Sequence, residues 1–126
     1  MNEQCFQRTL DLFRAAASGT SGREALAAIG AAYRELIESD RTMLQGQLQS
    51  YAASVVDEDV RESTARGYGR LVDYVETVSG ADRQTISSFF AKGMLMNVLA
   101  AMDYSIADGT DSWEARLADG CREDDV

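Results

Sequence analysis

The chain has 126 residues, of which 45% are hydrophobic and 26% charged, and its formal net charge is −9. This composition is that of an ordinary soluble globular domain, and it excludes intrinsic disorder and fibrous repeats. Proteins that hold DNA by themselves gather lysines and arginines against the phosphates. Here Lys92 is the only lysine and the arginines are scattered among acidic residues. We therefore expect no nucleic-acid binding by this chain alone.

The longest apolar stretch, residues 89–102, is interrupted by Lys92 and Asn97. It is shorter than the roughly 20 apolar residues that a membrane-spanning helix needs. No N-terminal segment combines a basic start with an apolar core, as a signal peptide does. We therefore expect a cytoplasmic protein without membrane contact.

The sequence contains no proline, although average usage would give about six in a chain of this length. Apolar residues recur at helical spacing, which predicts helices over residues 2–17, 21–37, 43–55, 57–78 and 82–104. A further short apolar stretch contains Trp113 and Leu117. The sequence therefore predicts a single all-α domain over residues 1–126, an antiparallel bundle of about five main helices. Residues 119–126 are expected to form a disordered tail.

Helix start and stop signals separate these segments. Ser21 with Glu24 and Asp111 with Glu114 fit the capping-box pattern, in which two side chains satisfy free backbone N–H groups. Asp40 and Asp82 are expected N-caps, and the acidic residues 57–59 favour a helix start there. Gly80 is an expected C-cap, and Gly109 is expected to end the fifth helix or its frayed tail.

Residues for catalysis or metal binding are scarce. The chain has no histidine, and its two cysteines, Cys5 and Cys121, lie near opposite ends. This excludes a typical zinc site and makes a disulfide an unfavoured interpretation. No phosphate loop or activated nucleophile is visible, so we expect neither an enzyme nor a cofactor. The Gly67-Tyr68-Gly69 segment is better interpreted as a close helix–helix contact than as a phosphate cradle.

The fifth predicted helix is apolar almost all round between residues 89 and 102, so it must be buried on more than one side. A central position in the core would explain this. We favour the alternative that it forms a homodimer seam with the fourth helix, in which Asn97 fixes the register. The residues predicted for this seam are Gly67, Leu71, Val75, Phe89, Gly93, Asn97 and Ala101.

Gln47 lies in the apolar register of the third helix, with Leu44, Leu48 and Tyr51. A buried amide needs hydrogen-bond partners, which a neighbouring backbone group or a polar ligand can provide. The second interpretation predicts a pocket of aromatic and thioether side chains with a few polar groups that orient a small apolar or aromatic molecule. The residues predicted for this pocket are Phe13, Tyr33, Met43, Gln47, Tyr51, Phe90 and Met94.

Four segments, at residues 28–37, 43–53, 66–72 and 89–102, resemble the C-terminal domain of TetR/AcrR-like transcriptional regulators. The similarity extends from Gln4 to about Asp103, and the surplus of arginine over lysine is typical of a high-GC bacterium. The resemblance implies a regulator that dimerises through its last two long helices and senses a small, usually apolar ligand within its helical core.

In that family an N-terminal helix-turn-helix reads the operator, and this chain has no such segment. The resemblance identifies residues 1–18 as the remnant of the helix that links reader and sensor. The function expected is therefore the ligand-sensing and dimerisation domain of a bacterial regulator without its DNA-binding half. The alternative is a protein-interaction or dimerisation module that stands alone and binds no ligand.

Overall fold

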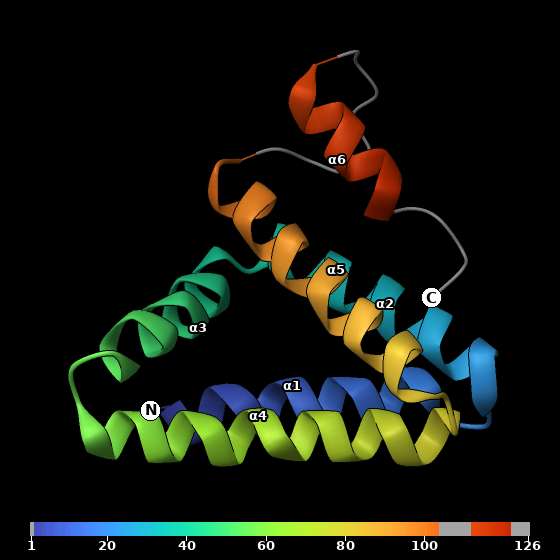
Figure 1. The fold of residues 1–126 in the computed structure, drawn as a ribbon, viewed down its shortest axis with the longest axis horizontal. Coiled ribbons are helices and arrows are strands. Elements are labelled where there is room, and N and C mark those ends of the chain that lie inside the picture. The colour runs from blue at the N-terminus through green and yellow to red at the C-terminus, as the bar shows by residue number, and fades with distance from the viewer. Residues whose placement is uncertain (1, 104–111, 122–126) are drawn as a thin grey trace.

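The computed structural model describes residues 2–103 and 112–121, and this part of the chain folds into six helices without a strand (Figure 1). The all-α prediction is confirmed. The helices are α1 (Asn2–Ala17), α2 (Gly22–Ser39), α3 (Arg41–Ser54), α4 (Glu58–Ser79), α5 (Arg83–Ala101) and α6 (Trp113–Cys121).

Most of the predicted helix ends are set by the expected side chains. Asp40 caps α3 by accepting from the backbone N–H of Met43 at 3.0 Å, and Asp82 caps α5 by accepting from Thr85 at 2.8 Å. Asp57 does the same at the start of α4. Gly80 ends α4 in the left-handed conformation, with φ of 62°, which costs glycine no side-chain clash.

One of the expected helix starts differs. Ser21 precedes α2 in an extended conformation, but its side chain makes no capping hydrogen bond, so the predicted capping box with Glu24 is wrong. At the start of α6 the backbone N–H of Ala115 donates to Ser112 Oγ at 3.2 Å. Asp111, Gly109 and Tyr104, which the predictions also used, lie outside the described residues.

The helices pack against one another in several pairs, chiefly α1 with α2 and α4, and α3 with α4. In Figure 1, α1 and α4 lie side by side at the bottom, and α2 and α5 lie above them. At the left, α3 packs against α4, and at the top α6 packs against α5. None of the helices in the described ranges is long and apolar enough to cross a membrane.

Phe6 of α1 lies directly against α4 at Gly67. A Cβ atom built on Gly67 would lie 2.6 Å from Cγ of Phe6, which is too close for any real contact. The absence of a side chain therefore lets the Phe6 ring lie directly against the α4 backbone. The predicted close helix contact at Gly67 is confirmed, and its partner is α1 of the same chain.

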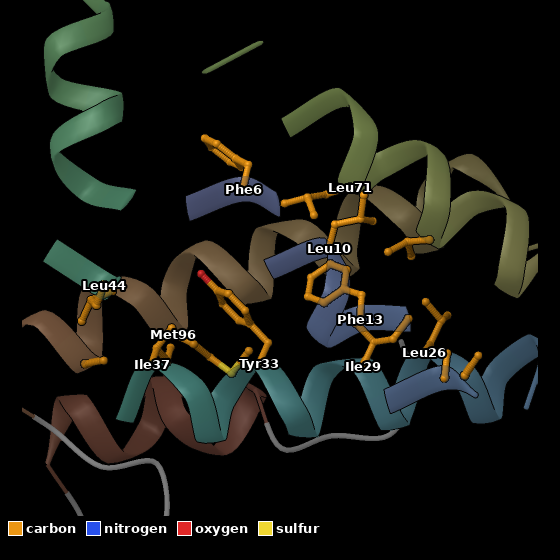
Figure 2. Packing of buried hydrophobic residues seen from close by; sticks show 14 of the residues in the cluster. Phe6, Leu10, Phe13, Leu26, Ile29, Tyr33, Ile37, Leu44, Leu71 and Met96 are labelled. Carbon is orange, nitrogen blue, oxygen red and sulfur yellow. The ribbon is translucent and has the colours of Figure 1, made fainter. Parts of the chain in front are cut away.

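The core is formed by the apolar faces of all six helices. Figure 2 shows the Phe13 ring of α1 beside Tyr33 of α2, with the Tyr33 hydroxyl directed away from its own helix. Their rings meet edge to face, with centroids 6.2 Å apart. The buried hydrophobic cluster includes Phe6, Leu10, Phe13, Leu26, Ile29, Tyr33, Ile37, Leu44, Leu71, Val75, Met96 and Leu99.

The C-terminal helix departs from the sequence prediction. Its buried residues are Ala115 and Ala118, which pack it against α5, whereas Trp113 and Leu117 are largely exposed. The expected tail of residues 119–126 is wrong for residues 119–121, which belong to α6. A helix of small residues carries too little apolar periodicity in its sequence to reveal which face is buried.

Candidate ligand cavity

A cavity of about 980 Å³ lies between the helices, with wall residues from all six of them. Clefts of roughly 300–1,000 Å³ are typical of small-molecule sites. The wall is formed by Phe13, Arg23, Glu24, Leu26, Ala27, Gly30, Ala31, Tyr33, Arg34, Glu38, Gln47, Tyr51, Tyr68, Leu71, Phe89, Phe90, Lys92, Gly93, Met94, Met96, Asn97 and Cys121.

The structure places six of the seven residues predicted for the pocket on this wall: Phe13, Tyr33, Gln47, Tyr51, Phe90 and Met94. Met43 is not among them. It is buried at the first turn of α3, where its backbone oxygen faces the Cys5 thiol at 4.0 Å. It lies four positions before Gln47, and this places it one turn along the helix from the amide. Helical spacing identified the correct face, but not how far along it the cavity extends.

A buried polar cluster occupies one part of the wall. Gln47 is 3% exposed and Asn97 is 2% exposed, and the hydroxyl of Tyr33 lies between them. Tyr33 Oη is 3.0 Å from Gln47 Oε1 and 2.6 Å from Asn97 Oδ1. On its other side, Gln47 Nε2 donates to Tyr51 Oη at 2.9 Å. The Tyr33 hydroxyl of α2 therefore joins Gln47 of α3 and Asn97 of α5 through side-chain hydrogen bonds.

Both phenols of this cluster are held in their neutral form. Burial raises the pKa of Tyr33 to about 12, although its hydrogen bonds to Asn97 and Gln47 oppose part of the rise. Burial likewise raises the pKa of Tyr51, against the hydrogen bond from Gln47. Removing water from around a phenolate destabilises its charge. The cluster is therefore uncharged near pH 7 and suits a neutral group.

Aromatic rings form a continuous apolar wall beside the cluster. Tyr51 meets Tyr68 edge to face at 6.2 Å between centroids, Tyr68 meets Phe90 at 5.6 Å, and Phe90 meets Phe89 at 5.4 Å. Such rings supply flat apolar surface with few rotatable bonds. Met94 adds an adaptable thioether on α5, whose sulfur accepts from Asn97 Nδ2 at 3.7 Å.

Charged side chains line another part of the cavity. Burial raises the pKa of the Cys121 thiol, and the charges of Lys92 on α5 and Arg34 on α2 oppose part of this rise. The thiol lies 4.0 Å from the backbone oxygen of Lys92. Arg23, Glu24 and Glu38 also reach the wall. Basic and acidic groups thus alternate here, outside the neutral cluster.

The residues predicted for a dimer seam are mostly used inside the chain. Leu71 and Val75 belong to the hydrophobic core, and Asn97 Oδ1 accepts from the Tyr33 hydroxyl of the same chain. Gly67 is covered by Phe6, and Phe89 and Gly93 line the cavity. Only Ala101 of the seven is exposed. The internal core thus already uses much of the apolar faces of α4 and α5, and the seam stays a prediction.

Sequence reasoning missed several contributors. Asn97 was assigned to the seam, yet it completes the polar cluster, and Tyr68 supplies the ring between Tyr51 and Phe90. The signal for Asn97 was present, since a buried amide on an apolar helix needs a partner, and Tyr33 lies on the opposing helix. Tyr68 gave no such signal, because an aromatic residue within a helical pattern does not show which residues it contacts.

Among the described residues, no group of three or more histidine, cysteine or carboxylate side chains is placed to hold a metal ion. The two cysteines are not joined in a disulfide. Comparison with known proteins found no matching family model, no matching curated protein sequence and no matching solved structure.

Proposed function

We propose that this chain is the ligand-sensing and dimerisation domain of a bacterial TetR-like transcriptional regulator, and that a small apolar or aromatic molecule binds in the cavity between its helices. The observation that carries the proposal is the cavity itself. It combines aromatic walls with a small buried group of polar side chains, which is the usual construction of a small-molecule site.

The position of α1 supports a sensing role. This helix contributes Phe13 to the cavity wall and packs its Phe6 against Gly67 of α4. A ligand that contacts Phe13 therefore touches the helix that the family resemblance assigns to the connection with a DNA reader. If α1 has two positions, a ligand changes their populations only as far as it binds one position more tightly than the other.

The test is thermal unfolding of the full chain with an apolar aromatic probe, 4-methylbiphenyl. Binding to the folded state should raise the melting temperature as the probe concentration rises. At a probe concentration of a hundred times Kd, the free energy of unfolding should be larger by about 2.7 kcal/mol. Gly93→Leu should remove this effect. Among the described residues, nothing lies within 4 Å of a Cβ built on Gly93, so the new side chain enters the space beside this wall position.

Gly46→Leu is the matched control, because Gly46 also lies in a helix with open space beside it but does not line the cavity. Gly93→Ala serves as a milder variant that keeps the fold if leucine disturbs it. A wild-type chain whose melting temperature does not respond to the probe would contradict the proposal. Equal binding by the Gly93→Leu and wild-type chains would place the probe elsewhere.

A protein-interaction module is the second candidate, and the exposed apolar residues near the C-terminal end of the described chain favour it. Val98 and Met102 lie one turn apart at the end of α5, and Trp113 and Leu117 lie one turn apart on α6. Large apolar side chains exposed together are typical of interaction surfaces. The same residues suit the homodimer that the first proposal includes.

A further inference from the structure

The hydrogen bonds of the polar cluster are not fully matched by protons. A phenol carries one proton, so Tyr33 donates to one amide oxygen at a time. The shorter of its two contacts, 2.6 Å, is to Asn97 Oδ1, and the contact to Gln47 Oε1 is 3.0 Å. When Tyr33 donates to Asn97, the Gln47 oxygen has no donor among the described residues.

Tyr51, in contrast, has a hydroxyl proton that no hydrogen bond among the described residues uses. Its oxygen accepts from Gln47 Nε2 at 2.9 Å, and within the described part of the chain no acceptor receives its own hydroxyl proton. The cluster therefore presents an unused proton on Tyr51 and an unused lone pair on Gln47. Both groups lie on the cavity wall, and the same amide joins them.

We propose that the ligand of this cavity carries a neutral hydroxyl group, phenolic or alcoholic, which accepts from Tyr51 Oη and donates to Gln47 Oε1. This inference rests on the proposed ligand-sensing function and adds the chemistry of the polar end. The apolar body of the ligand then lies along the rings of Tyr68, Phe89 and Phe90, which continue the wall from Tyr51.

A hydroxyl fits because it both donates and accepts. An ether or a ketone uses the Tyr51 proton and leaves the Gln47 oxygen without a donor. A carboxylate has the same shortcoming and also brings a charge to two phenols that burial keeps neutral. The hydrogen bonds of this cluster join Tyr33, Gln47, Tyr51 and Asn97 to one another, and the wall cations Arg23, Arg34 and Lys92 are not among these partners.

One internal arrangement competes with the ligand. If the Gln47 amide rotates by half a turn, Tyr51 donates to Gln47, Gln47 to Tyr33, and Tyr33 to Asn97. The chain of hydrogen bonds is then complete without a ligand. A cluster locked in this arrangement would not distinguish a hydroxyl from an ether, which makes that comparison the decisive measurement.

The experiment measures the affinity of the full chain by calorimetry for four probes that share one apolar body: 4-phenylphenol, 4-methoxybiphenyl, 4-methylbiphenyl and biphenyl-4-carboxylate. We expect the phenol to bind about tenfold more tightly than the methoxy and methyl compounds, the gain of one well-made hydrogen bond. Tyr51→Phe should lower the affinity for the phenol about tenfold and leave 4-methylbiphenyl unchanged.

Tyr74→Phe is the matched control, since Tyr74 lies on α4 outside the cavity wall, with its ring under Arg14. It should leave all four affinities unchanged. Equal binding of the phenol and the ether would overturn the hydroxyl proposal while the proposed function stands. Tightest binding of the carboxylate, lost in Arg34→Gln, would also overturn it. Failure of all four probes to bind would remove the proposed function and this inference together.

Discussion

At the scale of single residues, the two glycines of the Gly67-Tyr68-Gly69 segment behave differently although they are two positions apart. Gly67 lies against Phe6 of α1, and a Cβ there would overlap the base of the Phe6 ring. Gly69 has no atom within 4 Å of its Cβ position among the described residues. Sequence alone does not separate them, since both occur inside the same helical pattern.

This contrast gives a paired prediction. Gly67→Ala should lower the free energy of unfolding by about 1–3 kcal/mol, because Phe6 and α1 must move away from α4. Gly69→Ala should raise it by about 0.5–1 kcal/mol, because alanine loses less backbone entropy in a helix. Urea unfolding of both variants measures the difference. Equal effects of the two substitutions would contradict the close contact at Gly67.

The residue scale also shows where sequence reasoning succeeded at the site. Gln47 stood out because an amide occupied an apolar helical position, and its side chain does lie in a buried cluster. The register of the third helix placed Tyr51 one turn further on the same face. The partner on α5 was not identifiable, because no local pattern states which helix lies opposite which.

At the scale of helices, boundaries followed the capping residues closely. The fourth helix was predicted over residues 57–78, and α4 spans Glu58–Ser79 with Asp57 as its N-cap. Caps are local, since one side chain and the next three residues decide them. The choice of interface was not local. The apolar faces of α4 and α5 were correctly expected to be buried, but whether a core or a second subunit buries them depends on the whole fold.

A comparison of two N-caps tests the local argument. Asp82→Ala should lower the melting temperature, because the backbone N–H of Thr85 loses its acceptor at the start of α5. Ser21→Ala should have little effect, since the Ser21 side chain makes no capping bond. Differential scanning calorimetry at pH 7 compares the two. A larger loss for Ser21→Ala would mean that Ser21, not Asp82, caps its helix through its side chain.

The Asp82 contribution also carries a pH signature. Its hydrogen bonds to Thr85 hold the pKa of the carboxylate below its usual range in the folded chain. A lowered folded-state pKa stabilises the fold above the ordinary carboxylate pKa and loses this effect as the pH falls through the folded-state value. The difference in free energy of unfolding between wild type and Asp82→Ala should therefore shrink on acidification, which calorimetry over the acidic range measures.

At the scale of the molecule, the cavity and the exposed apolar surface lie on different sides of α5. One face carries Gly93, Met94 and Asn97 toward the cavity, and another leaves Val98 and Met102 exposed. This division accounts for the almost uniformly apolar sequence of the helix, which the sequence analysis had attributed to a seam with α4. The burial of α5 on more than one side was predictable from composition, whereas the identity of each neighbour required the fold.

The exposed surface of α6 offers a second place, beside the predicted seam, to test self-association. Trp113 is 50% exposed and Leu117 is 41% exposed, while the alanines of the same helix are buried against the rest of the chain. Because the helix is held by its small residues, a charge at Leu117 should leave it folded. We therefore expect Leu117→Glu to weaken a homodimer without changing helix content.

Sedimentation velocity at tens of micromolar measures this association, since a dimer with micromolar Kd is stable by about 8 kcal/mol. Wild type should sediment as a dimer, and Leu117→Glu should shift toward monomer with an unchanged circular dichroism spectrum.

Val56→Glu is the control, because Val56 is 85% exposed on the turn between α3 and α4, away from α6. A charge there should leave the dimer intact, since isolated exposed apolar residues are common on monomers. A monomeric wild type would remove the dimer from the proposed function. Equal loss in both variants would show that the added charge, rather than the α6 surface, controls association.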